Sequence, residues 1–280
     1  MATRSCSICL IIVIGLTLAL ASCVTSREVQ IMSYEQYARI PGPHKTPYIL
    51  RIQGSKGALL YFGADHSVDP NHHQVPELVR LWDEFRPTVA YTEGGIPPLC
   101  QSLEEAVRRY GEGGPVRILA ERDRIPVGNL EPAMETQVEM LLDHFSREQV
   151  KLHYLLRQVM QYRREKRGDS LELYLEPLMR ELNSIPELEG PPRMVAEIGE
   201  CVKSVLPGLA DWTRVPQSWF VPTRSETLTN EIARRLSRFR DEHMVSVLIE
   251  EVEKGERVFA VVGFSHALMQ EPALRSAIEK

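Results

Sequence analysis

The sequence predicts an α/β fold: a mostly parallel, twisted sheet with an antiparallel hairpin at one edge, helices on both faces and an α-helical insertion. Three observations support this prediction. Short apolar runs alternate with amphipathic helical patterns, which is typical of strands paired in parallel. Two of these runs lead into the pattern Gly-x-x-His, at Gly63 and at Gly263. From about residue 134 to 206 the pattern is helical throughout.

Composition and charge limit the class of protein. The chain has 280 residues, of which 43% are hydrophobic and 25% charged, as in an ordinary globular protein. Its formal net charge is −5, and basic and acidic residues are mixed along the chain. This distribution lacks the basic patch that nucleic acid would need, so we expect no nucleic-acid partner.

The first 22 residues have the pattern of a lipoprotein signal peptide. Arg4 precedes an apolar run from Ile8 to Ala21, which is short for a membrane-spanning helix. The run continues as Ser-Cys, which resembles a bacterial lipobox with Cys23 as the lipidated residue. We expect an acylated Cys23 to anchor the protein to an envelope membrane. Val24 favours the outer membrane, facing the periplasm; a non-lipidated signal peptide or a plain membrane anchor stays open.

Residues 23–47 are predicted to be a polar, proline-containing tether, and the domain is expected to occupy residues 48–280. Its first element is a hairpin of strands at Tyr48–Ile52 and Ala58–Phe62 around a Gly-Ser-Lys-Gly turn. Apolar residues from Val75 to Phe85 then recur at helical spacing, and Thr88–Thr92 follows as a strand. This strand, helix and strand predict a βαβ unit with parallel pairing.

The remaining elements follow from caps, breakers and apolar runs. Ser102 with Glu105, and Ser146 with Gln149, resemble capping boxes at helix starts. Ser225 is expected to cap a long helix. The remaining predicted segments are a helix to Tyr110, a helix at Val116–Asp123, a strand at Ile125–Asn129, the insertion at about 134–206, a helix to Lys254, a strand at Arg257–Val262 and a helix at Ala267–Lys280.

Four side chains that can bind metals or transfer protons follow the carboxyl ends of these strands: His66, Glu93, Glu131 and His266. In an open parallel sheet these ends meet at one edge, where ligands bind. Two imidazoles with one or two carboxylates can hold a divalent cation such as Mn, Co or Zn, which makes a bound water more acidic. Without metal, one histidine would act as general base, with Glu93 or Glu131 holding its tautomer. Both hypotheses stay open.

Four short motifs resemble, in order, those of the Tiki/TraB/GumN superfamily, which includes erythromycin esterases and ChaN-like haem-binding lipoproteins. They are Gly63-Ala64-Asp65-His66, Glu93 after a strand, Arg240-Asp241-x-x-Met244 and Gly263-Phe264-Ser265-His266. The resemblance covers about residues 48–100 and 220–280. It implies a metal-dependent protease (Tiki branch), an esterase acting on a macrolide lactone, or a haem-binding protein at an envelope membrane.

The resemblance also implies roles for residues. His66, Glu93 and His266 would bind the metal or act in catalysis, and Arg240 would stabilise an oxyanion or a substrate carboxylate. A surface ion pair of Arg240 with Asp241, Glu242 or Asp211 stays open. Asp65 and Glu131 are expected to contact the metal-binding or catalytic side chains and hold them in place, without contacting the metal or substrate. Asp65 could instead cap a helix.

His72 and His73 resemble a second histidine cluster of the ChaN-like proteins and are candidate haem ligands; simple solvation is the alternative. We interpret His153, like His44, His144 and His243, as a surface or hydrogen-bonded histidine, and whether Cys100 and Cys201 pair stays open. The leading hypothesis is a lipid-anchored, metal-dependent hydrolase of a small-molecule or peptide substrate with a peptide or ester bond. The alternatives are a haem- or iron-binding lipoprotein without hydrolase activity, and an inactive scaffold.

Overall fold

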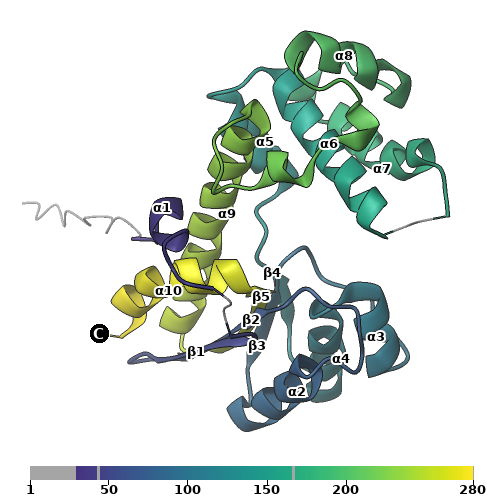
Figure 1. Ribbon diagram of the computed structural model, residues 1–280. Helices are drawn as coiled ribbons and strands as arrows, with labels where there is room; N and C mark the ends of the chain where they lie inside the picture. The colour runs from purple at the N-terminus through teal and green to yellow at the C-terminus, as the bar shows by residue number, and fades with distance from the viewer. Residues whose placement is uncertain (1–29, 43–44, 166–167, 280) are drawn as a thin grey trace, which may run out of the picture.

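A computed structural model describes residues 30–42, 45–165 and 168–279 (Figure 1). The predicted fold class is confirmed: a mixed sheet of five strands lies between helices in one lobe, and the insertion forms a second, helical lobe. The strands are β1 (Tyr48–Gln53), β2 (Ala58–Ala64), β3 (Val89–Thr92), β4 (Val127–Asn129) and β5 (Arg257–Gly263). The α-helices are α1 (Tyr34–Tyr37), α2 (Gln74–Phe85), α3 (Leu103–Tyr110), α4 (Gly113–Asp123), α5 (Met134–Leu142), α6 (Arg147–Glu165), α7 (Leu171–Ser184), α8 (Ile198–Val205), α9 (Leu228–Glu253) and α10 (Phe264–Ile278).

The strand order is β1-β2-β5-β3-β4. The predicted edge hairpin is confirmed, since β1 pairs antiparallel with β2. The expectation that β2 and β3 pair with each other is wrong, because β5 from the end of the chain lies between them and pairs in parallel with both. Both strands of the βαβ unit therefore use β5 as their neighbour. Side chains of β5 from Val258 to Val262 are buried, as expected for a central strand.

Alternate residues of the central strands pack into two different cores, because successive side chains of a strand point to opposite faces. On one face Leu60 and Phe259 pack with α2, where Trp82 is fully buried. On the other face Tyr61 and Ala260 pack against α9 and α10. Both faces of the sheet are thus covered, and its carboxyl edge remains for the loops and the insertion.

The insertion has a hydrophobic core of its own, built mainly from α5, α6, α7 and α8. Helix α9 connects the lobes (Figure 1): Ile232 and Leu236 belong to the core of the insertion, whereas Met244 and Leu248 belong to the core beneath the sheet. Residues 240 and 241 lie between these two parts of α9. The insertion is therefore packed over the sheet lobe through a helix that both share.

Two predicted helix starts are wrong, and one capping box is confirmed. Helix α9 is capped by Thr227, not Ser225, because Thr227 and Asn230 form a reciprocal capping box. Helix α10 begins at Phe264, directly after β5, and not at Ala267, so His266 lies in the first turn of a helix. Ser146 and Gln149 exchange the predicted capping bonds.

Part of the predicted tether belongs to the folded domain. Ile31 is buried, and the backbone N–H of Met32 donates to the carbonyl oxygen of Met269 at 2.9 Å. The predicted signal peptide 1–22 and Cys23 lie outside the described residues. Cys100 and Cys201 are free thiols and do not pair. In the part of the chain that the structure describes, no helix is both long and apolar enough to span a membrane.

Candidate functional site

The carboxyl edge of the sheet brings two glutamates onto one buried arginine. Glu93 directly follows β3, Glu131 follows β4 by one residue, and Arg240 reaches both from α9. Arg240 Nε donates to Glu131 Oε2 at 2.6 Å, and Nη2 donates to Glu93 Oε1 at 2.9 Å and to Glu131 Oε1. The arginine is 7% exposed. It is therefore an internal ion-pair centre and not the surface ion pair considered from the sequence.

His266 lies between two carboxylates. Its Nδ1 is 2.6 Å from Asp241 Oδ1, and its Nε2 is 3.4 Å from Glu93 Oε1. Asp241 also accepts a hydrogen bond of 2.6 Å from Gln270, which in turn accepts one of 2.6 Å from the Tyr61 hydroxyl. This buried chain of hydrogen bonds fixes the orientation of the imidazole.

The charges of this cluster stabilise one another. Burial alone would lower the pKa of His266, but the carboxylates of Glu93 and Asp241 raise this pKa to about 10. Burial alone would raise the pKa of Glu93, but His266, Arg240 and the backbone N–H of Gly263 hold it well below its ordinary value. That N–H donates to Glu93 Oε2 at 2.7 Å, at the positive N-terminus of α10. At neutral pH Glu93 is thus ionised and His266 is an imidazolium.

His66 approaches the cluster from β2 and is more exposed. Its Nδ1 is 2.6 Å from Glu112 Oε1, a bond that raises the pKa of His66. Its side chain is 66% exposed. A Cβ atom on Gly263 would lie 2.8 Å from His66 Nε2 and 3.5 Å from Glu93 Oε2. His66 Nε2 and Glu93 Oε2 therefore both border the space beside Gly263, which a side chain at residue 263 would enter.

The substitution Gly263→Ala tests this geometry. The new methyl group would meet the His66 ring, which is exposed and can swing away from Glu93. We expect a loss of stability of about 1 kcal/mol or less, since the change falls at a helix N-cap. Under the hydrolase hypothesis, the rate of hydrolysis should fall roughly tenfold to hundredfold, because displaced catalytic groups contribute much less to the rate. Gly208→Ala, at a position with no atom within 4 Å of the new Cβ, is the control. Unchanged activity in Gly263→Ala would contradict the role of His66.

The remaining predicted site residues lie elsewhere. The Asp65 carboxylate is 3.9 Å from His72 Nε2, and α2 has His73, not Asp65, at its N-cap position. His73 Nε2 is 3.0 Å from the carbonyl oxygen of Thr46, and its ring centroid is 4.5 Å from that of His72. Neither of these histidines lines the cavity beside Glu93, Arg240 and His266. The structure thus brings together His66, Glu93, Glu131, Arg240 and His266, and leaves Asp65, His72 and His73 apart.

The cluster contains the residue types that bind divalent cations, two histidines and carboxylates. Each of the two histidines has a carboxylate at Nδ1, which is the usual arrangement of metal-ligating histidines, and His266 Nε2 is 3.4 Å from Glu93. In the ranges that the structure describes, no three His, Cys, Asp or Glu side chains form a group that could hold a metal ion. The metal site stays a prediction.

A cavity of about 290 Å³ opens onto this cluster. Its sheet side is lined by His66, Glu93, Arg240 and His266, and its insertion side includes His153 and Arg157 of α6. The interpretation of His153 as a surface or satisfied residue is wrong, because the side chain is buried and its Nδ1 has no hydrogen-bond partner in the described structure. The insertion therefore contributes to the site.

Sequence reasoning missed the partners of both histidines. For Asp241 a signal exists: it stands in α9 in line with Val245, Leu248 and Val252, so a charge interrupts an apolar stripe. Arg240 likewise stands four residues from Leu236 and from Met244, so it too is a charge within an apolar stripe of α9. Glu112 lies in a glycine-rich connection between α3 and α4 and carries no comparable signal.

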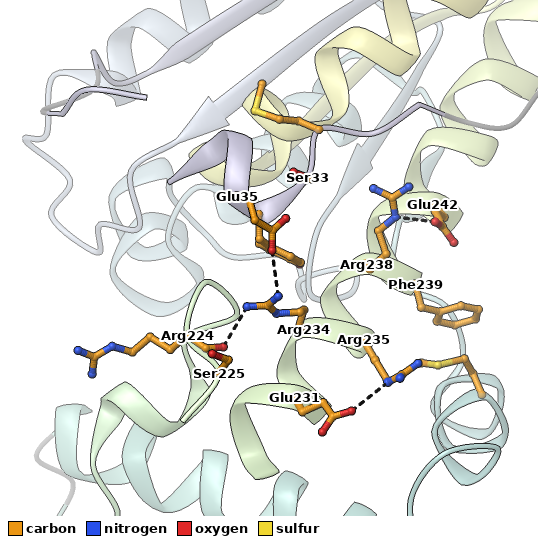
Figure 2. A pocket seen from close by; sticks show the side chains of 13 residues that line it. Ser33, Glu35, Arg224, Ser225, Glu231, Arg234, Arg235, Arg238, Phe239 and Glu242 are labelled. Carbon is orange, nitrogen blue, oxygen red and sulfur yellow. Dashed lines mark hydrogen bonds and ion pairs between the residues drawn. The ribbon is translucent and has the colours of Figure 1, made fainter. Parts of the chain in front are cut away.

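A larger cavity, of about 630 Å³, lies between α1 and α9 and is rich in arginine (Figure 2). Its arginines already have carboxylate partners. Arg234 is 3.1 Å from Glu35, Arg235 is 3.6 Å from Glu231, and Arg238 is 2.6 Å from Glu242. None of the predicted site residues lines it, so the smaller cavity is the candidate site.

The sequence matches no family model, and no curated protein or solved structure matches it. Membership of the Tiki/TraB/GumN superfamily therefore stays a prediction from the four motifs.

Proposed function

We propose that the protein is a metal-dependent hydrolase of peptide or ester bonds, anchored through Cys23 to the outer membrane and facing the periplasm. One observation carries the proposal: two imidazoles, each held at Nδ1 by a carboxylate, line one cavity at the carboxyl edge of the sheet together with Glu93 and a buried arginine. The motif resemblance to the Tiki branch supports the same reaction class.

The chain's own residues can position substrate and move protons. His66 is exposed to the cavity and lies next to Glu93, so it can exchange a proton with water or with a leaving group. Arg240 uses Nε and Nη2 for the glutamates, whereas its Nη1 has no partner within the described residues. Nη1 can therefore donate to an oxyanion that forms at the scissile carbonyl.

His66, Glu93 and His266 would hold the metal ion, which when bound supplies a water molecule of lowered pKa. Histidine ligands must be neutral, so the proton on His266 has to leave when metal binds. We therefore expect metal affinity to increase with pH.

The test compares the full chain with its His66→Ala and His266→Ala variants against a panel of nitrophenyl esters and labelled peptides. We expect the rate of hydrolysis to fall about a hundredfold in both variants, together with the content of Mn, Co or Zn. His144→Ala changes an exposed histidine away from the cavity and should behave as the unmodified chain. Full activity in both site variants would exclude the assignment. Stoichiometric haem binding that depends on His72 and His73 would instead favour the haem-binding lipoprotein.

A further inference from the structure

The insertion places two nitrogen-bearing side chains on the cavity wall opposite the sheet. His153 and Arg157 stand one helical turn apart on α6, so they lie on the same face of that helix. Both line the cavity together with Arg240 and His266. Neither belongs to the hydrogen-bonded cluster around Glu93.

Arg157 is a cation without a counter-charge. It has no hydrogen bond or ion pair with any residue that the structure describes. Burial of part of the side chain, followed by the charge on Arg240, lowers the pKa of Arg157, and the charges of Glu131 and Glu93 only partly oppose this. Its side chain nevertheless remains accessible to solvent through the cavity. A guanidinium stays protonated even so.

The contrast with the larger cavity is informative. There, Arg234, Arg235 and Arg238 each have a glutamate within ion-pair distance (Figure 2). In the smaller cavity the nearby carboxylates of Glu93 and Glu131 are already bound to Arg240. A negatively charged ligand would relieve the repulsion between the two guanidinium groups of this cavity.

His153 adds an unsatisfied donor or acceptor. The side chain is 1% exposed, and its Nδ1 has no hydrogen-bond partner in the described structure. Burial lowers the pKa of His153 to about 3, so the ring is neutral at physiological pH. A buried polar atom without a partner is unfavourable, and a ligand in the cavity toward which the imidazole could turn Nδ1 would remove this penalty.

We propose that Arg157 and His153 form an anion-binding subsite for a carboxylate group of the substrate. The proposal rests on the proposed function and specifies its substrate class as esters or peptides with a free carboxylate. A planar carboxylate matches the guanidinium fork, and its single charge equals the one uncompensated charge of the subsite. A phosphate monoester carries about −1.5 to −2 charges and would leave an excess of negative charge. The cavity volume of about 290 Å³ suits a small ligand or the end of a longer one.

Calorimetric binding to the full chain tests the subsite without requiring turnover. The probes are N-benzoylglycine and, as the uncharged analogue, N-benzoylglycinamide. We expect the acid to bind and the amide to bind at least tenfold more weakly. Arg157→Gln should weaken binding of the acid roughly tenfold to hundredfold, as charge-assisted hydrogen bonds are lost. Arg164→Gln, an exposed arginine of the same helix outside the cavity lining, should bind as the unmodified chain does.

Three outcomes would overturn the subsite: no binding of the acid, equal binding of acid and amide, or unchanged affinity in Arg157→Gln. Tighter, Arg157-dependent binding of phenyl phosphate would overturn the choice of a carboxylate. His153→Leu separates the second residue, because unchanged affinity for the acid would show that His153 takes no part.

Hydrolysis of nitrophenyl succinate and nitrophenyl butyrate then distinguishes the two proposals. If the hydrolase assignment holds and the subsite fails, both esters are hydrolysed with the same dependence on Arg157. If the subsite holds and the hydrolase fails, the acid binds and neither ester is hydrolysed. We expect the kcat/KM ratio of the two esters to fall at least tenfold in Arg157→Gln, mainly through the KM of the succinate.

Discussion

Replacing Arg240 by methionine is expected to destabilise the fold by about 3 to 5 kcal/mol at neutral pH, the range found when one partner of a buried ion pair is removed. Arg240 is 7% exposed and bonds both Glu93 and Glu131, whose side chains are 18% and 15% exposed. The substitution leaves Glu131 without its cation and leaves Glu93 with only His266. The measurement is the free energy of unfolding in urea at pH 7.5 and at pH 5. The loss should be smaller at pH 5, because the unpaired carboxylates of the variant can then take up protons.

Arg235→Met provides the matched control on the same helix. Arg235 is 3.6 Å from Glu231, and both side chains are largely exposed, so we expect a change within about 1 kcal/mol. Equal losses in the two variants would show that the buried cluster contributes no more than a surface ion pair. A loss that does not depend on pH would show that packing, not charge, is responsible.

Asp241→Asn is expected to lower the pKa of His266 from about 10 by roughly 1 to 3, because it removes one of the two carboxylates that stabilise the imidazolium. Asparagine keeps the size of the side chain and one acceptor oxygen for Nδ1. The measurement is the NMR titration of ¹³C-labelled histidine in the metal-free full chain. In the proposed reaction, metal affinity and hydrolysis should fall roughly tenfold to hundredfold, the usual effect of removing the carboxylate behind a metal-ligating histidine.

Asp241→Asn should also reduce the stability of the fold, by an amount that depends on pH. The fold raises the pKa of His266 above the ordinary 6.5, so the stabilisation is fully present below pH 6.5 and is lost as the pH rises through about 10. The difference in stability between the unmodified chain and Asp241→Asn should therefore shrink above pH 7 and vanish above about pH 10. Glu242→Gln, an exposed neighbour on α9, should leave the titration of His266 unchanged. A normal pKa for His266 in the unmodified chain would contradict the ion-pair geometry.

Local sequence patterns predict where the strands of this fold lie, but they do not predict which strands pair. The apolar runs identify β2, β3 and β5, and their connections imply parallel strands. They do not identify β5 as the strand between β2 and β3, because a strand buried on both faces has no alternation that would fix its partner. Pairing of Leu60 and Ala90 with the same residue, Phe259, joins segments about 170 to 200 residues apart, and no local pattern encodes such a contact.

The site was predictable where it depends on strand ends. His66, Glu93, Glu131 and His266 meet because parallel strands end at one edge, and the sequence shows those ends. The residues that orient these side chains and shift their pKa values come from α9, from a loop and from the insertion. The positions of these three segments depend on tertiary packing. His153 illustrates the limit: a histidine interpreted from the sequence as a surface or hydrogen-bonded residue is, in the fold, buried beside a cavity.

Helix α9 also restricts how the cavity can change shape. Its first half is packed into the core of the insertion and its second half into the core beneath the sheet, with Arg240 and Asp241 between them. A hinge rotation of one lobe against the other would have to bend α9 near these residues and pull Arg240 from its glutamates, or His266 from Asp241. The ion pairs of Arg240 with its glutamates and of His266 with Asp241 therefore also fix the spacing between Arg157 and Arg240. This spacing sets the length of ligand that can span the cavity.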